Sequence, residues 1–70
     1  MPYVNIKVTR EDVTSAQKAR LISGVTTLLQ EVLSKTPNTT HVIIDEVDID
    51  NWGLGGEPVS RRRRALKSSA

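Results

Sequence analysis

The chain has 70 residues and a formal net charge of +2, and it contains no cysteine. This length permits one small domain, which alone would bury only about 60% of its unfolded surface. Disulfides and thiolate metal sites are excluded, and a single histidine, His41, cannot hold a metal ion by itself. The sequence therefore predicts no metal and no cofactor, and it indicates oligomerisation as the remaining source of stability.

The charge is divided unevenly along the chain. Residues 61–70 carry five basic residues and no acid, which leaves five basic against eight acidic residues, a net charge of −3, in residues 1–60. An acidic body with a basic tail argues against a protein that binds nucleic acid over its whole surface. No apolar run approaches the roughly 18 residues of a membrane span, and no signal peptide follows Met1, so we expect a cytoplasmic protein with no membrane partner.

Residues 3–9 alternate between polar and apolar side chains, which predicts a strand with Val4, Ile6 and Val8 on one face. Pro2 shares the parity of this apolar set. Proline is tolerated at the first position of a strand, where its missing N–H matters least. We therefore expect the ring nitrogen of Pro2 to lie toward the packed side.

The chemistry available at Pro2 depends on Met1. If Met1 is removed, the chain begins with a secondary amine, and α-amino groups titrate at about 7.7 to 8.0, nearer neutrality than lysine. If Met1 is retained, the same nitrogen is an amide without basicity. A proline in second place is also common for reasons of translation and processing, so a reading without chemistry stays open.

The segment Thr14-Ser15-Ala16-Gln17 has the form of a capping box and predicts the start of a helix. Apolar residues then recur at helical spacing: Leu21, Ile22, Val25, Leu28, Leu29, Val32 and Leu33. Pro37 disfavours helix at the residue before it and provides a stop. We predict a helix over residues 15–34, roughly 30 Å long.

Residues 40–47 are rich in β-branched side chains and predict a second strand. The order strand, helix, strand predicts a right-handed βαβ unit with parallel strands. Two strands under one helix do not make a stable sheet, so we expect two chains to pair into a four-stranded sheet. Three glycines within residues 53–56 predict a tight turn or short hairpin. They do not open a helix and no Lys-Ser or Lys-Thr pair follows them, as a phosphate-binding loop would require.

The predicted fold class is thus α/β, a single βαβ unit with a short C-terminal hairpin. We assign residues 1–60 to one domain and residues 61–70 to a basic, flexible tail.

A group of features occurs together in this short chain. They are the initial Met-Pro, the βαβ order, the pair Gln17-Lys18, the strand Val42-Ile43-Ile44-Asp45-Glu46 and the segment Trp52-Gly53-Leu54-Gly55-Gly56-Glu57. Over about residues 2–60 the chain thereby resembles the 4-oxalocrotonate tautomerase family. The resemblance implies the tautomerase fold, a hexamer built from three βαβ dimers, and an isomerase that acts on a small enol or dienol acid such as 2-hydroxymuconate.

The resemblance also implies roles for single residues. In the family the N-terminal proline is the general base, and Pro2 matches that position. An apolar pocket and nearby cations would keep such an amine free at neutral pH. Trp52 matches an aromatic residue in the wall of the pocket, where Phe is usual. The alternative for Trp52 is a hydrophobic filler without a role in binding.

Two arginines bind the substrate in well-known family members, and this chain departs at both. Arg10 is the candidate for the first, although its connection to the helix is one residue longer, and a solvated loop charge is the alternative. His41 aligns with the second arginine. A neutral imidazole has one N–H donor, whereas a guanidinium is charged and can bind a carboxylate through two parallel N–H bonds. The alternative for His41 is an exposed residue at a strand end. Arg61 or Arg62 could provide the missing charge by folding over the pocket, or belong to a solvated tail.

The leading hypothesis is a homo-oligomeric keto–enol tautomerase whose partner is a small enol or keto acid. A different class of function stays open, in which a non-catalytic oligomer uses the arginines of residues 61–64 to bind nucleic acid or another polyanion with steep salt dependence. A third possibility is a pseudo-enzyme subunit that serves a partner protein.

Overall fold

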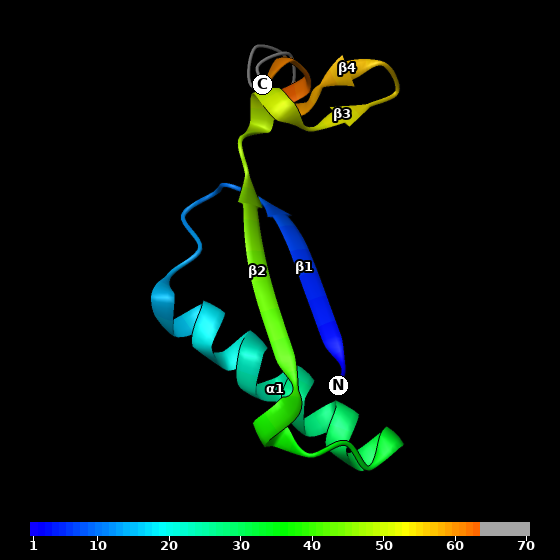
Figure 1. Cartoon of the computed structure of the whole chain (residues 1–70). Coiled ribbons are helices and arrows are strands. Elements are labelled where there is room, and N and C mark those ends of the chain that lie inside the picture. Colours follow the sequence, from blue (N-terminus) through cyan, green and yellow to red (C-terminus); the bar gives the residue numbers. More distant parts are fainter. Residues whose placement is uncertain (64–70) are drawn as a thin grey trace.

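The computed structural model describes residues 1–63 and shows a βαβ unit followed by a small hairpin (Figure 1). Its elements are strand β1 (Tyr3–Thr9), helix α1 (Ser15–Leu33), the 3-10 turn η1 (Pro37–Thr39), strand β2 (His41–Val47), the 3-10 turn η2 (Ile49–Asn51) and strands β3 (Gly53–Leu54) and β4 (Glu57–Pro58). Residues 59–63 are helical up to the end of the described part. The predicted α/β class and order of elements are confirmed.

Strands β1 and β2 pair in parallel with a register that is continuous over all seven residues of each strand. The hydrogen bonding extends beyond both ends of β1. The N–H of His41 donates to the carbonyl of Pro2 at 3.0 Å, and the N–H of Arg10 donates to the carbonyl of Val47 at 2.8 Å. The backbones of Pro2 and Arg10 are therefore fixed at opposite ends of the same two-stranded sheet.

Helix α1 begins where the capping box predicts it. The Thr14 hydroxyl accepts a hydrogen bond from the Gln17 N–H at 3.1 Å, and the Gln17 side chain accepts one from the Thr14 N–H at 2.9 Å. The helix ends at Leu33, one residue before the predicted end, because Ser34 adopts the left-handed conformation with φ 57°. Pro37 opens the turn η1 that leads into β2.

Helix α1 crosses one face of the β1–β2 pair (Figure 1). The residues on that face are half-buried: Val4, Ile6 and Val8 of β1, and Val42, Ile44 and Glu46 of β2. The carboxylate of Glu46 forms an ion pair with the ammonium of Lys18 on the helix, at 2.5 Å. An apolar layer closed at one end by an ion pair therefore joins the helix to the sheet.

The opposite face of the sheet is open. Tyr3 is 62% and Ile43 49% exposed on it. Lys7 and Asp45 pair across the two strands at 2.6 Å, and this hydrogen bond raises the pKa of the Lys7 ammonium. Within residues 1–63 no apolar side chain is buried at all. The Cα radius of gyration is 16.1 Å, whereas a compact domain of this length has about 11 Å. One chain alone therefore does not close a hydrophobic core.

Strands β3 and β4 form the predicted hairpin, and it extends beyond the end of the β1–β2 pair (Figure 1). Gly55 and Gly56 make its two-residue turn with φ 64° and 85°, a conformation that suits glycine and the twist of a hairpin. After β4 the chain turns into the short C-terminal helix. The predicted tail thus includes helical residues 61–63, while residues 64–70 lie outside the described residues. No helix in the described part is long and apolar enough to cross a membrane.

Thr14→Ala should lower the free energy of unfolding by about 1 kcal/mol, because it removes the acceptor of the capping box. Urea denaturation at one fixed protein concentration measures this, since assembly and folding are coupled. Ser15→Ala is the matched control, because the Ser15 side chain makes no hydrogen bond in the described structure, and it should change the stability by less than about 0.5 kcal/mol. Equal stability of Thr14→Ala and wild type would contradict the capping role.

The exposed apolar residues predict an oligomer in solution. Light scattering should give a mass several times the 7.7 kDa of one chain. Ile43→Lys should reduce that mass, because it places a charge on the open face of the sheet. Asn38→Lys in the exposed turn η1 should leave the mass unchanged. A folded, monodisperse monomer would contradict the prediction.

Candidate active site

Pro2 and His41 lie together where both strands begin. Pro2 is half-buried, in line with Val4 on the helix-covered side, and the Met1 side chain before it is exposed. The bond from the His41 N–H to the Pro2 carbonyl joins the two residues through the backbone. His41 itself is exposed, so its imidazole borders the surface beside Pro2.

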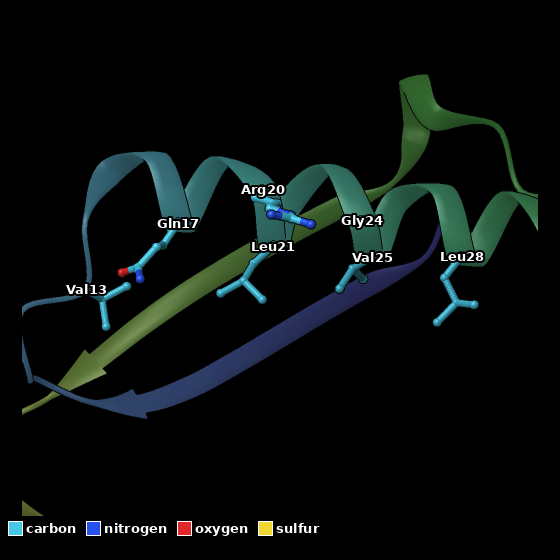
Figure 2. Close-up of a pocket in the computed structure, with 7 residues that line it drawn as sticks. All are labelled: Val13, Gln17, Arg20, Leu21, Gly24, Val25 and Leu28. Atoms are coloured by element: carbon cyan, nitrogen blue, oxygen red, sulfur yellow. The ribbon is translucent and has the colours of Figure 1, made fainter.

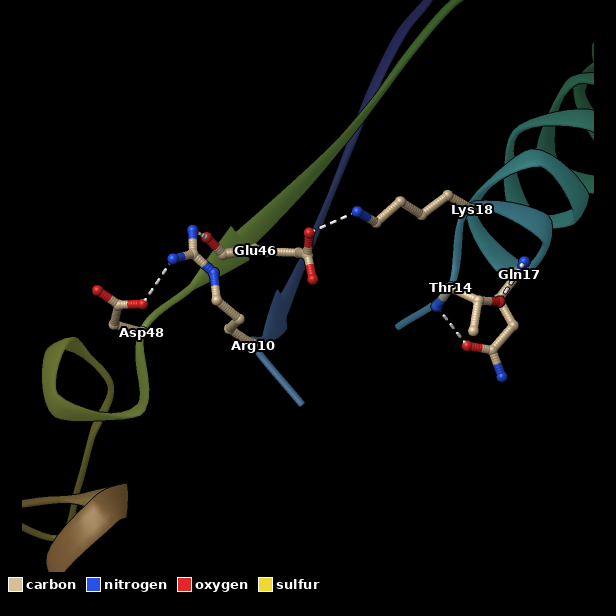
Figure 3. Close-up of polar contacts among 6 residues, drawn as sticks. All are labelled: Arg10, Thr14, Gln17, Lys18, Glu46 and Asp48. Carbon is tan, nitrogen blue, oxygen red and sulfur yellow. Dashed lines mark hydrogen bonds and ion pairs between the residues drawn. The ribbon is translucent and has the colours of Figure 1, made fainter. Parts of the chain in front are cut away.

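Arg10 lies where the two strands end. Its guanidinium forms an ion pair with Asp48 at 2.9 Å and donates to the Glu46 carbonyl at 3.5 Å (Figure 3). The carboxylate of Glu46 meanwhile holds Lys18 of the helix (Figure 3). Arg10 is therefore held along the end of β2, with an acidic neighbour that offsets its charge.

Trp52 follows η2 and is half-buried. Its carbonyl accepts a hydrogen bond from the Val59 N–H at 2.7 Å, so it is fixed at the base of the C-terminal helix. Trp52 lines an open cleft of about 870 Å³ that runs from the end of β1 to the hairpin and is also bordered by Val8, Leu54 and Arg62. The cleft combines apolar side chains with charged groups on its rim.

The four residues singled out from the sequence thus form two pairs. Pro2 and His41 lie at one end of the sheet, and Arg10 and Trp52 lie at the other. Seven residues of strand separate the ends, which at about 3.3 Å per residue is roughly 20 Å. One chain does not bring all four residues into a single site.

A further ion pair near Trp52 was not predicted from the sequence. The guanidinium of Arg63 binds the Glu11 carboxylate, with one bond of 2.8 Å, and the Thr9 hydroxyl donates to the same carboxylate. The contact joins the connection between β1 and α1 to the C-terminal helix. Glu11 and Arg63 are 52 positions apart, and no local pattern in the sequence pairs them.

Helix α1 carries a second hollow of about 620 Å³ (Figure 2). Leu21, Val25 and Leu28 line it, and Gly24 leaves room between them. It contains none of the residues predicted for the site. Within residues 1–63 no cluster of His, Asp and Glu is suited to a metal ion.

Comparison with known proteins places this architecture in a wider group. The family model described as "Tautomerase enzyme" matches residues 2–62. The probable tautomerase K2 of Dickeya dadantii is 59% identical over 64 residues, which is 91% of this chain and 96% of that protein. The crystal structure of DmpI from Helicobacter pylori superposes with a TM-score of 0.83 and 48% identity, over 90% of this chain and 97% of that one.

A third similarity is to TomN, described as a 4-oxalocrotonate tautomerase homologue in the tomaymycin biosynthetic pathway. Its TM-score is 0.83 at 25% identity, over 90% of this chain and 95% of that one. The fold and these similarities define a small α/β isomerase of the tautomerase type. The chain belongs to the 4-oxalocrotonate tautomerase family.

Proposed function

We propose that this isomerase is a keto–enol tautomerase for a small enol or dienol carboxylic acid such as 2-hydroxymuconate, with Pro2 as the general base after removal of Met1. The observation that carries the proposal is the environment of Pro2. It is half-buried in line with an apolar strand face, and its only close polar contact within residues 1–63 is a backbone bond to His41. Partial desolvation disfavours the ammonium form of an amine, which a base must avoid.

The Pro2 amine takes one proton from the substrate and returns one to it, so the reaction only moves a proton and the double bonds within the substrate. The Pro2 nitrogen accepts the proton of the enol hydroxyl, and the C–O bond becomes a carbonyl as the conjugated double bonds shift. The resulting ammonium then returns a proton to the carbon that has gained electron density. One nitrogen acts as base and then as acid, so the reaction needs neither an oxidant nor a cofactor.

We further propose that two chains complete each site. The support is that the four candidate residues occur in pairs at opposite ends of the sheet, and that one chain leaves its apolar residues unburied. If the end of one chain that carries Pro2 and His41 faces the end of another that carries Arg10 and Trp52, all four residues meet. Three such dimers would form the hexamer that the resemblance implies.

In this arrangement Trp52 provides an apolar wall that excludes water from the proton transfer. Arg10 and His41 provide polar contacts to the substrate. A polyanion-binding role for the basic tail has less support, because the Arg63 charge is offset by Glu11.

Pro2→Ala should reduce kcat/KM toward 2-hydroxymuconate or phenylenolpyruvate by at least about a hundredfold, the scale of a lost general base. The ultraviolet absorbance of the enol follows the reaction, and intact mass shows whether Met1 is removed. Asn38→Ala, in the exposed turn η1, is the control and should keep full activity. Retained Met1, an inert wild type or an active Pro2→Ala variant would each contradict the proposal.

Mixing two inactive variants tests the shared site. Pro2→Ala and Trp52→Ala chains, unfolded and refolded together, should regain part of the wild-type activity, because some sites combine an intact Pro2 with an intact Trp52 from the other chain. Each variant refolded alone serves as the control and should stay inactive. If the mixture is no more active than the separate variants, the two residues do not meet across chains.

A further inference from the structure

The cleft beside Trp52 is lined by charged residues that take no part in the proposed proton transfer. Two basic residues border it, Arg62 and Arg63, together with the acidic residues Glu11 and Asp12. Glu11 and Arg63 bind each other, so their charges offset within the pair. Of the two arginines, Arg62 is thus the one that forms no ion pair within residues 1–63.

Arg10 and Arg62 differ in their contacts, and therefore in how readily each can bind an anion. The Arg10 guanidinium lies 2.9 Å from the Asp48 carboxylate, which would repel the carboxylate of an incoming ligand. Within residues 1–63 Arg62 makes no ion pair, and its one polar contact is a long hydrogen bond of 3.5 Å to the Leu54 carbonyl. A guanidinium has five N–H donors, so most of those on Arg62 are available to a ligand.

The position of Arg62 is determined by the hairpin and the C-terminal helix. The N–H of Val59 donates to the Trp52 carbonyl, and the hydroxyl of Ser60, the one buried residue in the described chain, donates to Asp50. A Cβ added at Gly55 would lie 3.5 Å from Nη1 of Arg62, so the guanidinium rests over the hairpin turn. Arg62 is therefore held near Trp52 by folded backbone, although its side chain is exposed.

We propose that Arg62 receives the carboxylate of the substrate in the cleft beside Trp52. This inference rests on the proposed function and adds to it the residue that binds the acid group. The planar guanidinium matches a carboxylate through two parallel N–H bonds, and Trp52 and Leu54 provide apolar surface for the unsaturated carbon chain. Asp12 borders the same cleft but forms no ion pair with Arg62 in the described structure.

The class of ligand follows from these groups. A guanidinium that forms no ion pair within residues 1–63 and lies beside Trp52 fits a small, flat, unsaturated acid with a single carboxylate at this position. A neutral amide of the same shape lacks the charge and should bind weakly in comparison, because hydrogen bonds between charged groups are the stronger ones.

Binding is measured through Trp52, which is the only tryptophan of the chain, so its fluorescence reports on the cleft. The probe is crotonate, an unsaturated acid with no enol to convert, and crotonamide is its neutral counterpart. Crotonate should change the Trp52 fluorescence of the wild type. Arg62→Ala should raise its Kd roughly ten- to hundredfold, the range for a lost hydrogen bond to a charged group. Crotonamide should bind weakly to both proteins.

Two further variants are matched to Arg62→Ala. Arg61→Ala removes a neighbouring exposed guanidinium that has no polar contact within residues 1–63, and it should change the crotonate Kd by less than about twofold. Arg62→Lys keeps the charge but cannot form two parallel N–H bonds to a carboxylate, and its Kd should lie between those of wild type and Arg62→Ala. An unchanged Kd in Arg62→Ala, equal losses in Arg61→Ala and Arg62→Ala, or a Trp52 signal that crotonate does not alter would each overturn the inference.

Turnover separates this inference from the proposed function. A wild type that binds crotonate through Arg62 but does not convert enol acids would remove the tautomerase proposal and support the carboxylate site. A wild type that converts enol acids, with the same kcat/KM in Arg62→Ala, would support the tautomerase and overturn the role of Arg62.

Discussion

Parallel pairing of β1 with β2 is the interaction on which the rest of the structure depends. Parallel strands bring their two starts to one end of the sheet and their two ends to the other. Pro2 is therefore joined to His41, and Arg10 lies near the segment that leads to Trp52. Backbone hydrogen bonds beyond the strands fix both groups, so the candidate site is divided by the topology itself.

A sheet of only these two strands leaves apolar side chains exposed to solvent. One helix packs on one face of a two-stranded sheet, and the other face exposes Tyr3 and Ile43. Because burial of apolar surface is the main favourable term in folding, a chain with no buried apolar side chain in its described part depends on further contacts. In the proposed assembly, contacts between chains would serve stability and catalysis together, because they would also bring the divided residues into one site.

The ion pairs join residues that are far apart in the sequence but close in the fold. Lys18 binds Glu46, Arg10 binds Asp48 and Arg63 binds Glu11, and each pair joins a different element to the sheet or its connections. Exposed pairs of this kind contribute little stability singly, but they determine which cations remain available to a ligand. By this criterion Arg62 differs from Arg10 and Arg63, although all three have the same guanidinium.

The sequence by itself determined the elements, because local patterns code for them. Alternating residues predicted β1, the capping box predicted the start of α1, and the glycines after Trp52 predicted the hairpin. Only the tertiary structure decided the partners of the charged side chains, since Arg63 and Glu11 meet across 52 positions and no local period encodes that contact. It also decided that Arg62 lies over the hairpin turn, because that contact follows from the path of the chain after β4.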